Sequence, residues 1–128
     1  IAGTYVWPMD NAWEGYATGT WQYIDSRYTQ IGDQIPGFGI VDLPALGNDI
    51  GGPLTEDFFL FNPELPSYNI LNLRFGFRND KYDIAFYVNN VGDERAFLAL
   101  DQERGSLARV GYLTNQPRTY GATVRMNF

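Results

Sequence analysis

Apolar and polar residues alternate along five stretches of the chain, at the spacing that β-strands require. Neighbouring side chains of a strand point to opposite sides, so each stretch has one apolar and one polar face. The last stretch, "RTYGATVRMNF", keeps this pattern as far as a terminal aromatic residue. The alternation predicts an all-β protein with about five antiparallel strands. These stretches are 1–7, 13–28, 68–78, 82–91 and 118–128.

The connections between these stretches alternate in length. We predict short turns at 8–12 and 79–81 and long loops at 29–67 and 101–116. Residues 92–100 are expected to prolong the preceding strand outward, and 29–67 has room for a short hairpin. Transmembrane barrels have this asymmetry, with short periplasmic turns and long extracellular loops. The loop lengths therefore favour strands that cross an outer membrane.

Two sets of side chains define the faces of the predicted sheet. A soluble sandwich, in which an apolar face packs on a second sheet, would have the same alternation, so both architectures stay open at this point. A polar face that carries arginines suits the interior of a wide barrel. We therefore expect Arg74, Arg78, Thr123 and Arg125 to face a lumen. The set expected to face lipid comprises Leu71, Leu73, Phe75, Phe77, Ile84, Phe86, Val88, Ala122, Val124 and Met126.

The composition, with 16% aromatic residues, suits an all-β protein and removes several classes of chemistry. The 128 residues include no cysteine and no histidine, which excludes disulfides, the usual zinc sites and catalysis by Cys or His. Without a histidine to activate a serine, we expect no enzyme, no catalytic residue, no cofactor and no metal site. A net charge of −6 argues against a nucleic-acid partner. No apolar run reaches the 18 residues or more that a transmembrane helix needs.

The segment from Thr29 to Ser67 differs from the rest of the chain. It holds five of the seven prolines and six carboxylates, and no lysine or arginine falls within it. Such a charge disfavours anionic ligands. It fits a cationic, neutral or glycan-like ligand or stabilisation by divalent ions at the cell surface, although acidity also keeps an exposed loop in solution. Its aromatic residues could contact a ligand or pack the loop onto itself. These candidate ligand-binding residues are Phe38, Phe58, Phe59 and Phe61.

The second half of the chain resembles a known family. The run "YNILNLRFGFRNDKYDIAFYVNNVGDERAF" followed by "NQPRTYGATVRMNF" is similar to the carboxyl end of the TonB-dependent receptors, active transporters of the Gram-negative outer membrane. The likeness covers residues 68–128 well and 1–28 loosely, and 29–67 matches no pattern of the family. The receptors have a plug domain and a 22-stranded barrel, whereas this chain has about five strands and no plug.

The resemblance implies that residues 1–128 form the carboxyl-terminal part of such a barrel. It implies import of a scarce ligand with energy supplied through the TonB protein, which acts on a plug outside these residues. Expected partners are the rest of the barrel, the plug, the barrel assembly machinery and outer-membrane lipid or lipopolysaccharide. The alternative is a small soluble β-sandwich or barrel that binds a partner through loop 29–67. The assembly signal implied by the resemblance consists of Tyr120, Val124, Met126 and Phe128.

Overall fold

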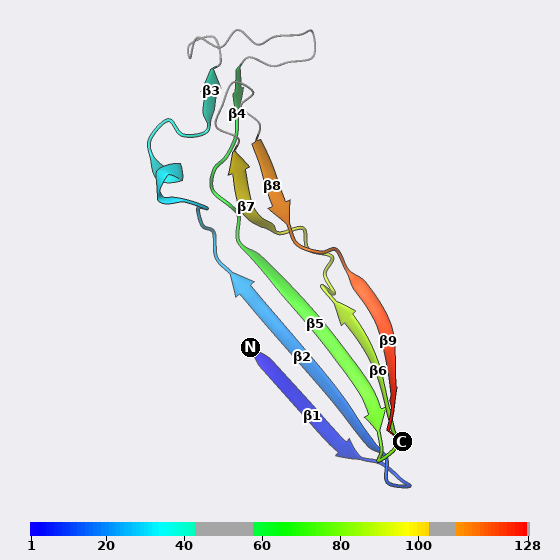
Figure 1. Cartoon of the computed structure of the whole chain (residues 1–128). Coiled ribbons are helices and arrows are strands. Elements are labelled where there is room, and N and C mark those ends of the chain that lie inside the picture. Colours follow the sequence, from blue (N-terminus) through cyan, green and yellow to red (C-terminus); the bar gives the residue numbers. More distant parts are fainter. Residues whose placement is uncertain (43–57, 103–109, 128) are drawn as a thin grey trace, which may run out of the picture. The chain divides into compact units, whose positions relative to one another are not determined.

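The chain is all-β, with antiparallel strands throughout the described residues. A computed structural model describes residues 1–42, 58–102 and 110–127, and these residues form nine strands and one short 3-10 helix (Figure 1). They divide into two compact units, 1–24 with 68–95 and 116–128 (unit 1), and 25–67 with 96–115 (unit 2). The elements are β1 (Ala2–Pro8), β2 (Glu14–Ile24), η1 (Ile31–Gln34), β3 (Ile40–Asp42), β4 (Phe58–Leu60), β5 (Tyr68–Arg78), β6 (Tyr82–Asn89), β7 (Phe97–Gln102), β8 (Val110–Thr114) and β9 (Thr119–Met126).

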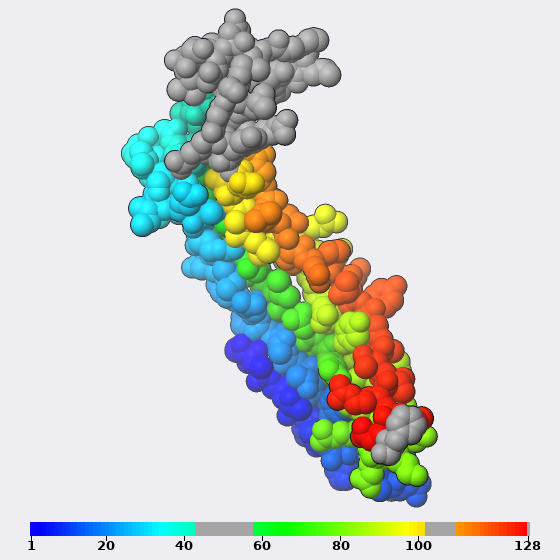
Figure 2. All heavy atoms as spheres, viewed as in Figure 1, coloured from blue at the N-terminus to red at the C-terminus, as the bar shows by residue number. Residues whose placement is uncertain are grey.

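Unit 1 is built on one five-stranded sheet in the order β1-β2-β5-β6-β9. Its longest strands, β2 and β5, pair without interruption from Glu14 opposite Arg78 to Ile24 opposite Tyr68. The expected five alternating stretches all lie in this sheet, so the prediction of an all-β fold is confirmed. The bands of the five strands lie next to one another in the space-filling view, and all remain visible from that side (Figure 2).

Short turns join β1 to β2 and β5 to β6, as the sequence predicts. Between β5 and β6, the Asn79 Oδ1 atom accepts hydrogen bonds from the backbone N–H groups of Lys81 and Tyr82, at 2.9 and 2.7 Å. An asparagine side chain that bonds the following backbone is a common way to fix a turn. Between β1 and β2, Asn11 and Ala12 adopt positive φ angles of 61°.

Three glycines of the sheet make room for an aromatic ring on the neighbouring strand. A Cβ atom on Gly76 would come within 2.7 Å of Tyr16 Cζ, and one on Gly121 would come equally close to Tyr87 Cζ. Real side chains do not tolerate such contacts, so these positions require glycine if the rings are to stay in place. In each case the aromatic residue and the glycine lie directly opposite one another in the strand register. The pairs are Trp7 with Gly15, Tyr16 with Gly76, and Tyr87 with Gly121.

The expected outward extension of β6 through residues 92–100 is wrong. The strand ends at Asn89, and Asn90 and Asp93 both have a φ angle of 53°, in the left-handed region that breaks an extended strand. Residues Phe97–Gln102 instead form β7, which pairs with β8 in unit 2. The long terminal loop is therefore largely a second hairpin, whose residues 103–109 lie outside the described residues.

The break after β6 is organised around the side chain of Asn90, which is only 4% exposed. Its Nδ2 atom donates to the carbonyls of Glu94 (2.9 Å) and Gln116 (3.1 Å), and its Oδ1 accepts from the Glu94 N–H at 2.9 Å. Its own N–H donates to Asn72 Oδ1 at 2.8 Å. Asn90 thus joins the end of β6 to β5 through its backbone N–H and to the segment that leads into β9 through its side chain.

Unit 2 consists of η1 and two two-stranded sheets, β3-β4 and β7-β8. The hairpin β3-β4 is the one for which segment 29–67 was expected to have room. Arg27 and Leu65 exchange two backbone hydrogen bonds, and the Leu65 side chain is fully buried. Asp33, also buried, caps the start of η1 by accepting a hydrogen bond from the Gln30 N–H at 3.0 Å. One of the six carboxylates of this segment is therefore structural.

We expect the Asn90→Ala substitution to lower the free energy of unfolding by about 2–3 kcal/mol, because it leaves buried backbone groups without hydrogen-bond partners. The loss can be measured by urea unfolding of the assembled protein, followed by tryptophan fluorescence. Asn89→Ala is the matched control, since Asn89 is exposed, and it should change stability by less than about 0.5 kcal/mol. Equal effects of the two substitutions would contradict this role of Asn90.

Candidate functional site

One face of the five-stranded sheet is apolar on every strand and exposed. Phe75 and Phe86 stack across β5 and β6 with ring centroids 5.3 Å apart, yet they are 48% and 40% exposed. On β9, Tyr120 and Val124 are 82% and 67% exposed. A soluble domain normally covers a contiguous apolar surface of this kind, because exposing it to water costs free energy in proportion to its area.

Strand pairing places the whole apolar set on this face. The register joins each member to an apolar residue or a glycine of the next strand, except Tyr23, which lies opposite Asn69. All ten residues predicted to share one side do so; that this side faces lipid stays a prediction. By strand, the face comprises Gly3, Tyr5 and Trp7; Gly15, Ala17, Gly19, Trp21 and Tyr23; Leu71, Leu73, Phe75 and Phe77; Tyr82, Ile84, Phe86 and Val88; and Tyr120, Ala122, Val124 and Met126.

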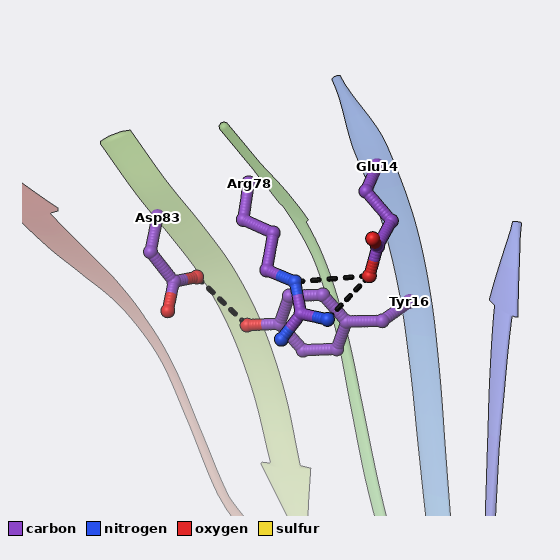
Figure 3. A network of polar contacts seen from close by, with 4 residues as sticks. All are labelled: Glu14, Tyr16, Arg78 and Asp83. Carbon is purple, nitrogen blue, oxygen red and sulfur yellow. Dashed lines mark hydrogen bonds and ion pairs between the residues drawn. The ribbon is translucent and has the colours of Figure 1, made fainter. Parts of the chain in front are cut away.

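The opposite face is polar and is centred on Tyr16. The ring of Tyr16 lies over Gly76 and is 9% exposed, and its hydroxyl donates a hydrogen bond to Asp83 Oδ1 at 2.9 Å (Figure 3). The guanidinium carbons of Arg74 and Arg78 lie 5.9 and 5.6 Å from the ring centroid, within the range of a cation–π interaction. Three strands thus contribute to one network.

Opposite charges are matched around this ring. Arg78 forms an ion pair with Glu14, its partner across β2 and β5, with the Nε atom 3.0 Å from Glu14 Oε1 (Figure 3). Asp83 stands between Arg78 and Arg125 in the register, one on each side. The ion pair is about half exposed, so its main effect is to orient the arginine and it adds little stability.

The polar face is also hollowed. A cavity of about 430 Å³ lies over β2, β5, β6 and β9, and a second of about 460 Å³ lies on the other side of Arg74, towards β1. The first is lined mainly by hydroxyl and amide groups, and it is a water-accessible, weakly cationic surface. Its lining residues are Thr18, Thr20, Asn72, Leu73, Arg74, Tyr87, Asn89 and Thr123.

The structure brings the four predicted lumen residues to one face. Arg74, Arg78, Thr123 and Arg125 occupy the same side of β5 and β9 as Tyr16. Of the predicted assembly signal, Tyr120, Val124 and Met126 share the apolar face of β9, which is an edge strand. Phe128 lies outside the described residues.

The predicted ligand-binding phenylalanines divide into two groups. Phe38 and Phe61 meet edge to face at 5.7 Å, and Phe59 lies 6.4 Å from Phe61. These contacts match the expected alternative in which the aromatic residues pack the loop onto itself. Phe58 stands apart, on the other side of β4 from Phe59, and is 57% exposed.

Tyr16, the centre of the polar face, was not among the predicted site residues. The signal was present in the sequence, because Tyr16 is the one aromatic residue that interrupts the polar set of its stretch. What a sequence does not reveal is its partner, since Gly76 and Asp83 lie opposite only once the register of three strands is known.

Within residues 1–42, 58–102 and 110–127, three or more acidic side chains never gather closely enough to hold a metal ion. The same residues contain no helix with the length and hydropathy needed to span a membrane. No protein-family model, curated protein or solved structure matches the chain.

We expect Tyr16→Phe to lower the free energy of unfolding by about 1–2 kcal/mol, because it leaves Asp83 without its hydroxyl donor while the ring stays over Gly76. Tyr87→Phe is the matched control, since Tyr87 also lies over a glycine but its hydroxyl forms no hydrogen bond among the described residues. Thermal or urea unfolding of both variants measures the difference. A cost for Tyr87→Phe as large as that for Tyr16→Phe would contradict the assigned role of the Asp83 bond.

Proposed function

We propose that the five-stranded sheet is a section of the wall of an outer-membrane β-barrel, part of a TonB-dependent receptor. In this proposal the apolar face contacts lipid and the polar face lines the lumen. The receptor binds a scarce ligand at the cell surface and imports it with energy supplied through TonB. Import itself depends on the plug and on the remaining strands, which lie outside these residues.

One observation carries the proposal: every strand of the sheet leaves large apolar side chains exposed on the apolar side. Tyr16 is 9% exposed on the polar face, whereas Phe75 is 48% exposed on the apolar one. A soluble sheet covers such an apolar face with a second layer. A bilayer removes the difficulty, because acyl chains take the place of a second apolar layer.

Strand length supports the same proposal. β2 and β5 are each 11 residues long, and a tilted transmembrane strand needs ~9–11. Strands of soluble proteins are usually about 5–6 residues long. A strand that covers a small soluble core would not need 11 residues. The apolar face is continuous from Gly15 to Tyr23 in β2 and from Leu71 to Phe77 in β5, as a membrane span requires.

The directions of the strands set a condition on closure. Each neighbouring pair in the sheet is antiparallel, so the two edge strands, β1 and β9, run in the same direction (Figure 1). An all-antiparallel barrel has an even number of strands, so it closes around this sheet only if an odd number of strands is added. Pairing β1 of one copy directly with β9 of another would create a parallel seam, which argues against a barrel made only of copies of this sheet.

The resemblance of residues 68–128 to TonB-dependent receptors supplies the specific family and the outer-membrane location. It also supplies the expected partners: the plug, the TonB complex, the assembly machinery that would read β9, and lipopolysaccharide. The competing function is a water-soluble binding module that uses loop 29–67. It requires another layer to cover the apolar face, and this requirement makes the two proposals separable.

The absence of cysteine allows a direct test with single-cysteine variants. We expect a nitroxide attached to Phe75→Cys to collide mainly with dissolved oxygen, which concentrates in lipid, and one attached to the adjacent Arg74→Cys to collide mainly with a water-soluble nickel chelate. The physical reason is that neighbouring residues of a strand face opposite sides. The measurement is continuous-wave electron paramagnetic resonance on the protein in lipid vesicles.

Asp80→Cys, in the exposed turn after β5, serves as the reference for full exposure to water. The proposal fails if the accessibilities at positions 74 and 75 are interchanged. It also fails if the label at position 75 is shielded from both reagents, the result expected when a second sheet covers the apolar face.

A second expectation follows from the two open edges. Folded alone in detergent, the 128-residue chain should give no compact, heat-modifiable band on an unboiled gel, because β1 and β9 lack the strands that would complete a barrel. The full receptor serves as the positive control. A stable monomer that needs neither detergent nor additional strands would contradict the barrel wall.

A further inference from the structure

Unit 2 contains a cavity that none of the predicted site residues lines. Its volume is about 510 Å³, within the range of cavities that hold small molecules. The walls come from three parts of unit 2: the segment that follows β2, the segment that follows β4, and the hairpin β7-β8. The lining residues are Ser26, Asn62, Glu64, Pro66, Ser67, Phe97 and Tyr112.

Hydrogen bonds to backbone atoms hold these walls together. Arg27 and Leu65 exchange bonds of 3.0 and 2.7 Å, which fixes the first two segments side by side. Arg27 Nη2 donates to the carbonyls of Phe97 (3.3 Å) and Leu98 (3.1 Å), and Tyr112 donates its hydroxyl to the Asn62 carbonyl at 2.8 Å. The cavity is therefore formed before a ligand arrives, which lowers the entropy cost of binding.

The apolar part of the lining is a pair of aromatic rings. Phe97 and Tyr112 lie with ring centroids 4.7 Å apart and planes inclined by 34°. The hydroxyl of Tyr112 is already donated to Asn62, so its ring offers a ligand mainly its π face and edge. Two fixed rings of this kind supply apolar contact area and an attractive surface for a cation.

The polar part of the lining carries a carboxylate and hydroxyls but no cation. The Glu64 N–H is bonded to Asn62 Oδ1 at 3.0 Å, which fixes the turn that presents this side chain. Within the described residues, the Glu64 carboxylate forms no ion pair, and the lining includes neither lysine nor arginine. Ser26 and Ser67 add two hydroxyls at the rim.

We propose that this cavity binds an organic cation: a protonated amine that carries an apolar or aromatic body. The ammonium group pairs with Glu64, and the body lies against Phe97 and Tyr112. Among the described residues of segment 29–67, Glu64 is the carboxylate that lines the cavity. The inference deepens the proposed receptor function by naming a ligand class, and it rests on that function only for the fate of the ligand.

A neutral sugar could also lie on an aromatic ring and bond to serine and asparagine. The unpaired carboxylate favours the cation, because a sugar would remove water from Glu64 without neutralising it. Glu64 is exposed, so solvent and salt screen its attraction, and we expect a preference of about tenfold rather than a larger one.

The test compares two probes of equal size, 2-phenylethylamine and 2-phenylethanol, with methyl glucoside as the third. Binding to the assembled protein in neutral detergent is measured by isothermal titration calorimetry and by saturation-transfer NMR. We expect the amine to bind about tenfold more tightly than the alcohol, and the preference to shrink as salt is raised. Glu64→Gln should abolish the preference without changing the affinity for the alcohol, and Phe97→Leu should weaken both aromatic probes.

Asp80→Asn is the matched control, because it removes the same charge from an exposed turn of unit 1 and should leave all affinities unchanged. Equal binding of amine and alcohol, preference for the glucoside, or no binding of any probe would each overturn the proposal. Loss of the preference for the amine in both Glu64→Gln and Asp80→Asn would also overturn the proposal. The preference would then depend on the net charge of the protein and not on Glu64. If the protein binds the amine but its apolar face is covered by another layer, the cation site is supported and only the membrane proposal is contradicted.

Discussion

The arrangement of unit 1 depends on the contact between the Tyr16 ring and the backbone of Gly76. The ring needs a position without a side chain on the neighbouring strand, so Gly76 must lie directly opposite. The bond from the Tyr16 hydroxyl to Asp83 extends the contact to β6. A shift of one residue between β2 and β5 would place Tyr16 against Phe75 or Phe77 and turn every side chain to the other face. The contact therefore fixes the register, and the register decides which face is apolar.

Burial follows from this register in an unusual way. Tyr16 covers Gly76, and Ala85, the partner of Gly76 on β6, is nearly inaccessible, so the polar face packs its own backbone without a second layer. The apolar face contains flat rings and branched side chains that can pack only sideways, as Phe75 and Phe86 do. Water is a poor solvent for such a surface. A sheet of this kind is consistent with an apolar environment on one side and a hydrated space on the other.

Much of unit 1 could be predicted because alternation is a local signal. Every second residue along β5, β6 and β9 lies on the same face, so the apolar positions of Leu73, Phe75 and Val124 can be assigned from the sequence. The end of β6 could not be predicted in this way, because Asn90 leaves the strand to satisfy carbonyls of Glu94 and Gln116, the second 26 residues away in the chain. The cavity of unit 2 was missed for the same reason. Its lining residues are ordinary in the sequence and meet only through backbone bonds between distant segments.

Most residues that carry the resemblance belong to unit 1, whereas those that could recognise a ligand belong to unit 2, and Phe97 is in both groups. In "VNNVGDER", Asn90 ties the strand end to its neighbours, and Asp93 accepts a hydrogen bond from the Arg118 N–H at 2.8 Å. The motif therefore serves the architecture of the sheet, and a resemblance based on it speaks for a barrel wall and says little of the cargo. The acidic segment resembles nothing in the family, yet it supplies Asn62 and Glu64 to the cavity. If the wall is common to many receptors, the ligand class has to be inferred from unit 2, and the proposed cation rests on the Phe97–Tyr112 pair and the Glu64 carboxylate.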